Sequence, residues 1–127
     1  MRAYWTDIEK QAKRNEDFRR VLFTGTNMQL VIMSLRPGEE IGEEVHMDHD
    51  QFFRVEEGKV RIELDGERLE LEEDSVILIP AGVRHNLTNI SSHEELKLYT
   101  LYAPPAHRDG TVQRTKADAM KAEAMLV

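Results

Sequence analysis

Residues 60–71 read VRIELDGERLEL, and this stretch decides the fold class. Apolar and charged side chains alternate in residues 60–64, and the alternation returns in residues 67–71 after the dipeptide Asp65-Gly66. A period of two residues is typical of a strand with one buried face, and Asp-Gly is typical of a two-residue hairpin turn. The stretch therefore predicts a β-hairpin that packs one face on a hydrophobic core.

The chain on either side of this hairpin shows related patterns. Residues 53–56 alternate in the same way, whereas residues 76–79 are all apolar, which predicts a strand covered on both faces. Further strands are predicted at residues 18–23, 29–35, 84–90 and 96–102. Because many short strands at this spacing are typical of a sandwich or a barrel, the predicted fold class is all-β.

Short helices are predicted near the two ends of the chain. Thr6 and Glu9 have the spacing of a capping box, which predicts a helix that ends at about Asn15. After an extended, Pro-containing tail, Thr115 precedes a second, Ala-rich helix over residues 116–125. Both helices are short, so we expect them to flank the sheets rather than to form the core.

Length and composition limit what the protein can be. The 127 residues carry 24 acidic against 17 basic side chains, and this formal net charge of -7 repels nucleic acid and anionic membranes. Because cysteine is absent, any metal must be bound through His, Asp, Glu, Asn or Gln. We expect one domain over residues 1–127, with a barrel core at about 18–103 and a tail and helix at 104–127. The absence of a signal-peptide pattern predicts a cytoplasmic location.

Histidines are the first candidates for a chemical role. The chain has five of them: His46, His49, His85, His93 and His107. His93 lies in a polar turn and His107 in the Pro-containing tail, so both are interpreted as surface or hydrogen-bonded structural residues rather than as metal ligands. His49 is flanked by two aspartates, which favours a solvated turn at the mouth of a pocket, with metal binding beside His46 as the alternative.

Four polar side chains are predicted to face the interior of the fold. Glu44 and His46 are two residues apart, so an extended strand points both to the same face. Gln51 is in phase with the apolar Phe53, and His85 is in phase with the apolar residue two positions later. A glutamate among such neighbours costs free energy unless a cation or hydrogen bonds compensate it. The pattern therefore predicts a polar pocket inside an apolar shell.

The sequence at this point resembles the cupin superfamily. Residues 80–89 read PAGVRHNLTN and match in full its second motif, P-x-G-x-x-H-x-x-x-N. Its first motif, two histidines, a glutamate and a glycine, aligns when it is anchored on Gly58. His46 and Gly58 then match it, whereas Glu44 stands in place of a histidine and Gln51 in place of the glutamate.

This resemblance, which covers about residues 38–103, implies a single β jelly-roll, or double-stranded β-helix, barrel around one divalent metal ion, which would be Mn, Fe, Ni or Zn. The implied ligands are Glu44, His46, Gln51 and His85. With neutral imidazoles this set carries a formal charge of about −1, as does the three-histidine, one-carboxylate set of the family. The alternative is a cupin whose pocket is polar and binds no metal.

Two classes of function fit this interpretation. The first is a metal-dependent isomerase, decarboxylase or dioxygenase that acts on a small molecule. The second is a non-catalytic module that binds or senses a small ligand or a sugar without a metal. A metal-free epimerase would need an acid/base pair that only His46 and His85 could supply. The expected partners are a small-molecule ligand and a second copy of the chain, paired through residues 30–35 or the C-terminal helix; neither nucleic acid nor a membrane is expected.

Overall fold

The computed structural model describes residues 2–125. In chain order its elements are α1 (Ile8–Arg14), β1 (Arg19–Thr24), β2 (Gln29–Leu35), β3 (Asp50–Glu57), β4 (Val60–Leu64), β5 (Glu67–Leu71), β6 (Val76–Ile79), β7 (His85–Asn89), β8 (Leu96–Ala103), β9 (Val112–Gln113) and α2 (Lys116–Met125). The chain is therefore mostly β, as its alternating pattern predicts. Within the described residues no helix is long and apolar enough to cross a membrane.

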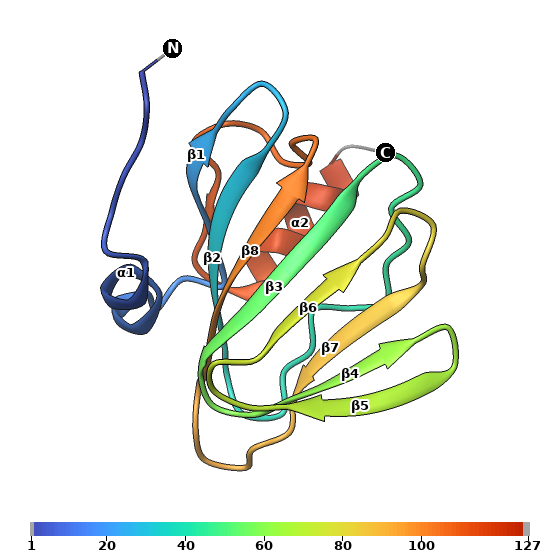
Figure 1. Ribbon diagram of the computed structural model, residues 1–127. Coiled ribbons are helices and arrows are strands. Elements are labelled where there is room, and N and C mark those ends of the chain that lie inside the picture. Colours follow the sequence, from blue (N-terminus) through green and yellow to red (C-terminus); the bar gives the residue numbers. More distant parts are fainter. Residues whose placement is uncertain (1, 126–127) are drawn as a thin grey trace.

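The strands form two antiparallel sheets that pack against each other (Figure 1). The larger sheet has the order β6-β3-β8-β2-β1-β9, and the smaller sheet has the order β5-β4-β7. Phe53 and Leu98 of the larger sheet share one apolar core with Ile62 and Leu87 of the smaller one. No described strand is hydrogen-bonded into both sheets, so the expected closed barrel is instead a pair of facing sheets.

The hairpin that decides the fold class is confirmed. β4 and β5 pair from Leu64 opposite Glu67, and the two residues between them have φ angles of 45° and 89°. These are the positive values that a tight Asp-Gly hairpin turn requires. On its other edge β4 pairs with β7, which places His85 opposite Leu64. The small sheet thus carries the predicted second-motif histidine to the interior.

The prediction that residues 76–79 are covered on both faces is wrong. β6 is an edge strand of the larger sheet and pairs only with β3. Its side chains alternate, so that Ile79 is buried while Val76 and Leu78 are 46% and 70% exposed. An apolar run does not distinguish an edge strand from a central one, because periodicity reports no sheet position.

The stretch 30–35 is not available as a docking surface. It forms most of β2, which lies between β8 and β1, and its residues from Val31 to Leu35 are buried. α1 packs on the face of the larger sheet that points away from the smaller sheet (Figure 1). This helix and the core therefore cover both faces of β2, which excludes the expected pairing through this strand.

The ends of the chain differ from the sequence expectation in two details. Asp7 rather than Thr6 caps α1, since its carboxylate accepts a hydrogen bond from the Lys10 N–H at 3.1 Å. The tail is not wholly irregular, because β9 within it pairs with the first two residues of β1. The start of α2 is confirmed, with Thr115 Oγ1 accepting a hydrogen bond from the third helical residue.

Candidate metal centre

The segment that precedes β3 runs along the free edge of β7 and brings the two motifs together. Glu44 and His85 exchange both backbone hydrogen bonds, each with an N···O distance of 2.9 Å. Residues directly opposite each other in this way point their side chains to the same face. His46 follows two residues after Glu44 and is held at its carbonyl by the N–H of Gly82 at 2.8 Å. The backbone thus fixes all three side chains on one face.

Ligand atoms of Glu44, His46 and His85 all lie within 4.8 Å of one another. His46 Nε2 is 2.6 Å from Glu44 Oε2, and the rings of His46 and His85 have centroids 5.4 Å apart. Apart from this carboxylate, the buried His46 Nε2 has no polar partner. Two nitrogens and a carboxylate oxygen therefore converge on one point.

Some of the buried polar atoms without a hydrogen-bond partner belong to the side chains around this point. Five such side-chain atoms occur in the described residues: Arg19 Nε, His46 Nε2, His49 Nε2, Gln51 Oε1 and Arg61 Nε. Since native proteins pair nearly all buried polar atoms, a cluster of unpaired ones indicates a missing ligand or ion. Three of the five, on His46, His49 and Gln51, are lone-pair or imidazole atoms of the kind that bind metals.

Gln51 faces inward as its phase with Phe53 predicts. It is 4% exposed, and its Nε2 donates to Thr100 Oγ1 at 3.1 Å while its Oε1 has no partner. In the larger sheet Gln51 lies opposite Tyr102, whose ring centroid is 6.0 Å from that of His46. The amide is therefore oriented with its oxygen, the atom that could bind a cation, left free.

His85 is oriented by its own backbone. It is buried, and its Nδ1 lies 2.9 Å from the carbonyl oxygen of Val83. A carbonyl can only accept, so Nδ1 carries the proton and Nε2 keeps the lone pair. Metal-binding histidines are held in this way by a partner on the other ring nitrogen. The Phe53 ring stands edge-on at 6.4 Å and walls this side of the centre.

His49 does not lie in a solvated turn, so the interpretation that its two aspartate neighbours favoured is wrong. Its side chain is 10% exposed, its ring stacks on His46 with centroids 4.4 Å apart, and its Nδ1 is 3.1 Å from Asp48 Oδ1. Burial, followed by the neighbouring His46, lowers the pKa of His49. Its neutral ring thus adjoins the three converging ligands, although it is not among the atoms that meet within 4.8 Å.

His107 is half-buried and hydrogen-bonded, which is consistent with its interpretation as a structural residue. Its Nε2 is 3.1 Å from the hydroxyl of Tyr102, which is itself buried and edge-on to His46 and His49. Burial lowers the pKa of His107 to about 4 and raises that of Tyr102 to about 12. Both side chains are therefore neutral at pH 7, and they form a hydrogen-bonded wall next to the centre.

The carboxylate of Glu44 is ionised in spite of its position. Burial raises its pKa, but the neighbouring His46, followed by Arg19 and His85, outweighs burial, so that the pKa of Glu44 lies below its ordinary value. Arg19 is a charged group of the interior that the alternation of β1 could have revealed, since it is in phase with Val21 and both are buried.

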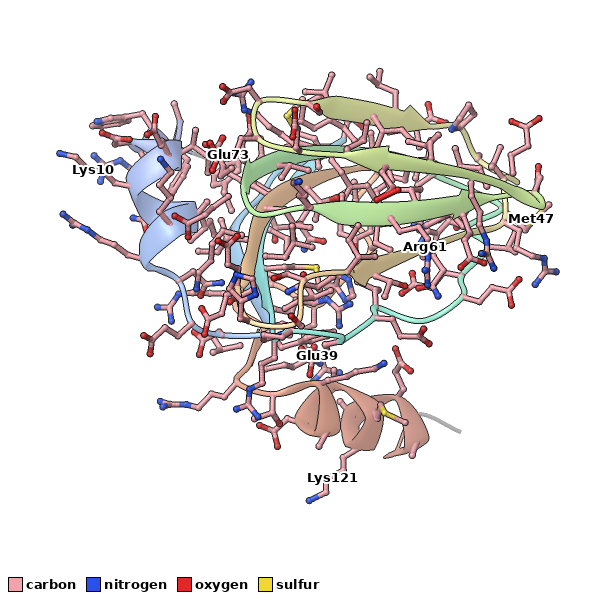
Figure 2. All side chains as sticks on the ribbon, turned by 90° about the horizontal axis from the view of Figure 1, so that it is seen from below. Lys10, Glu39, Met47, Arg61, Glu73 and Lys121 are labelled. Carbon is pink, nitrogen blue, oxygen red and sulfur yellow. The ribbon has the colours of Figure 1, made fainter. Side chains whose placement is uncertain are left out.

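The donor set fits a divalent transition metal. Two imidazoles and one carboxylate with adjacent neutral oxygen and nitrogen donors are typical of Fe(II), and also suit Mn, Ni and Zn. The structure brings Glu44, His46 and His85 together and leaves Gln51 Oε1 unpaired. Figure 2 shows exposed Met47, the neighbour of His46, at the end of the molecule opposite α1, where this segment reaches solvent. His93 is exposed, as expected, and lies in the turn before β8.

Comparison with known proteins agrees with this arrangement. The family model described as "Cupin domain" matches residues 31–102. The chain is 45% identical to a protein of Bacillus halodurans, BH2720, whose crystal structure has a TM-score of 0.91 and aligns over 94% of this chain and 95% of that one. It is 41% identical to the Bacillus subtilis protein YrkC over 96% of this chain and 68% of that protein.

A third relative carries a functional name. The Streptomyces cyaneus protein named polyketide synthase CurC is 36% identical over 75% of this chain and 64% of its own length. The chain thus spans about two thirds of the curated relatives it matches. With the second motif intact on β7, two facing antiparallel sheets and the family match over more than half of its length, the chain belongs to the cupin family.

Proposed function

We propose that this cupin binds one divalent transition-metal ion and uses it to act on a small, oxygen-rich organic molecule. The observation that carries the proposal is the convergence of Glu44, His46 and His85 beside the unpaired oxygen of Gln51. Without an ion, the buried unpaired oxygen of Gln51 would cost free energy. A cation shared by these residues removes that cost.

The residues around the centre would have different roles. Glu44, His46 and His85 would bind the ion with Gln51 as a weaker fourth ligand, and His49 adjoins them as the alternative fourth ligand. A bound divalent ion supplies a Lewis acid that polarises a carbonyl or enolate oxygen. Because Tyr102 stays protonated at neutral pH, its hydroxyl can hold a proton near a substrate oxygen without becoming a competing anion.

The substrate class follows from the donors and from one relative. Keto, enol and phenol oxygens are the groups that a Lewis acid and a neutral hydroxyl recognise together. CurC is named a polyketide synthase, and polyketides are built from such keto and enol groups. Isomerisation, decarboxylation and dioxygenation of a keto or phenolic molecule are therefore the reaction classes we propose to test first.

Metal analysis of protein purified without a His tag tests the metal site. We expect about one ion per chain, either as purified or after reconstitution with Mn, Fe, Ni or Zn. The variant His85→Ala should lose the ion. His93→Ala is the matched control, because His93 is exposed and has no role at the centre. If no divalent ion binds in stoichiometric amount, the proposal fails.

A turnover screen separates the enzyme from the sensor. β-Diketones, keto acids, phenols and sugars would be incubated with protein loaded with each metal, and consumption would be followed by mass spectrometry. Metal-dependent turnover that His85→Ala abolishes supports the enzyme. Binding without turnover across the screen would favour the second candidate, a non-catalytic module that binds the same small molecules. Tyr102 and His107, which are hydrogen-bonded to each other, would contact the ligand in this case.

We further propose that the two facing sheets correspond to the jelly-roll arrangement of cupins. The likeness to the Bacillus halodurans protein, with a TM-score of 0.91, supports it. A crystal structure with two facing sheets in the strand orders β6-β3-β8-β2-β1-β9 and β5-β4-β7 would support this assignment. A different strand order, or sheets that do not face each other, would contradict it.

A further inference from the structure

Arg19 is a buried cation without a carboxylate partner. It is 3% exposed, and within residues 2–125 its guanidinium forms no ion pair. Its Nη1 donates to the neutral side chain of Gln113 at 2.8 Å, and its Nε has no hydrogen-bond partner. A buried charge normally has an opposite charge beside it, because desolvation without one is costly. Arg19 therefore has no anionic side chain in direct contact among the described residues.

The neighbouring strand position provides a matched comparison. Arg20 follows Arg19 on β1 but points to the opposite face, where it is exposed and pairs with Asp17 at 3.2 Å. The two arginines share a strand and a residue type, and they differ in burial and in having an acidic partner. Of the two, only Arg19 lacks an acidic side chain in contact with its guanidinium.

Arg19 belongs to the same interior as the candidate metal centre. Its guanidinium lies over the Phe18 ring, with the central carbon 5.2 Å from the ring centroid. Its charge acts on Glu44 and on Tyr102, in both cases lowering the pKa against the effect of burial. It also contributes to the low pKa of His107 after burial. Arg19 is thus close enough to these groups to bind the same small molecule.

The charges of the interior leave room for an organic anion. The Glu44 carboxylate and the Arg19 guanidinium cancel, and the imidazoles that bind a metal are neutral. A divalent ion then brings the formal sum to about +2, in an environment where uncompensated charge is expensive. The molecule that enters must therefore carry the missing negative charge.

We propose that Arg19 binds the carboxylate group of the small molecule on which the centre acts, so that the ligand class is an organic carboxylate with a further keto or hydroxyl oxygen. The guanidinium suits a carboxylate because it presents parallel N–H donors to two oxygens. Gln113 accepts a hydrogen bond from Nη1, and the buried Nε of Arg19 has no hydrogen-bond partner. This inference rests on the proposed function, because the metal supplies part of the positive charge.

Isothermal calorimetry with defined probes tests the inference. Oxalate, pyruvate and salicylate would be titrated into the Zn²⁺-loaded wild type, Arg19→Gln and Arg20→Gln. Since a charge-assisted hydrogen bond outweighs a neutral one, Arg19→Gln should weaken binding by about tenfold or more. Arg20→Gln should leave the affinity within about twofold. The uncharged isostere salicylamide should bind the wild type and Arg19→Gln with similar affinity.

A purely structural role of Arg19 predicts a different result. If the side chain only anchors Gln113 of the tail, Arg19→Gln lowers the melting temperature but leaves the ratio of salicylate to salicylamide affinity unchanged, which would overturn the proposal. Arg19→Lys keeps the charge and loses the parallel donors, so it should retain part of that ratio if Arg19→Gln fails to fold. Absence of binding of all three carboxylates to the wild type would also overturn it.

Failure of the metal site can be recognised separately. Metal content would be measured on the same samples, so the loss of the ion is seen independently of carboxylate binding. In metal-free Glu44→Gln the guanidinium of Arg19 is the remaining charge of the interior, and carboxylates should bind it more tightly than they bind metal-free wild type. Equal binding by these two proteins would contradict the role of Arg19 even if no metal binds.

Discussion

Replacing Gly58 with alanine should destabilise the fold strongly. Gly58 is buried, has a φ of +96° and connects β3 to β4. A Cβ at this position would lie 2.9 Å from the backbone oxygen of Glu95 and 3.3 Å from the Cα of Leu96. Both are main-chain atoms of the turn into β8, so they cannot move aside as the end of a flexible side chain could.

Two terms set the magnitude. A left-handed backbone costs a non-glycine residue about 1–2 kcal/mol, and a forced shift of packed backbone costs about 1–3 kcal/mol more. We therefore expect Gly58→Ala to lower the free energy of unfolding by about 2–5 kcal/mol. With an unfolding entropy of about 2.1 cal/mol/K per residue, this loss corresponds to a melting temperature about 7–19 °C lower.

Gly66→Ala is the control that separates the two terms. Gly66 has a similar φ of +89°, but no atom lies within 4 Å of its added Cβ. Its loss should be the backbone term alone, about 1–2 kcal/mol. Urea denaturation followed by circular dichroism measures both variants. If the two losses are equal, the contact with Glu95 does not limit the residue at position 58, and the reasoning is refuted.

Three further predictions concern the centre, its histidine wall and the surface. Zn²⁺ at about 100 times its Kd should stabilise the protein by about 2.7 kcal/mol, which raises the melting temperature by about 10 °C. His93→Ala should keep this shift and His85→Ala should lose it. An unchanged shift in His85→Ala would exclude this residue as a ligand. Because the folded pKa of His107 is about 4 and lies below its ordinary 6.5, the unfolded chain takes up a proton first, so stability falls as pH drops from about 7 to 4 by about 2–3 kcal/mol. In urea titrations, His107→Gln should show a pH dependence smaller by that amount, and an identical dependence would contradict the burial of its ring. We also propose that the protein is a homodimer. Exposed Leu78 on edge strand β6 borders an apolar hollow with Met28 and Phe52, so Leu78→Asp should convert the dimer to a monomer in sedimentation. A monomeric wild type at micromolar concentration would refute the dimer.

The strands and the inward residues could be predicted because both follow from a two-residue period. β2 and β4 have the predicted bounds, and the parity of β3 and β7 turns Gln51 and His85 into the core as expected. Parity depends only on the local backbone, so it survives without knowledge of the tertiary structure. The same rule applied to β1 would have placed Arg19 inside.

What could not be predicted depends on contacts between distant parts of the chain. His107 is half-buried because the tail turns back and the side chain of Gln29 binds its N–H and its carbonyl, at 2.9 Å and 2.7 Å. Nothing near His107 in the sequence indicates this return. The exposure of Leu78 likewise depends on β6 being the last strand of its sheet, and sheet order is a property of the whole fold.

The two departures of this chain from the first cupin motif amount to moving one carboxylate between two positions. Moving the carboxylate from position 51 to position 44 keeps its formal charge and places it opposite His85, on a segment held by two backbone hydrogen bonds. The amide at position 51 then gains a donor role toward Thr100 that a carboxylate could not perform. Position 44 is also the one at which the charge of Arg19 acts on the carboxylate. The exchange thus places the metal-binding carboxylate of Glu44 under the influence of the buried cation Arg19. An organic carboxylate bound at Arg19 would then lie beside the candidate metal centre.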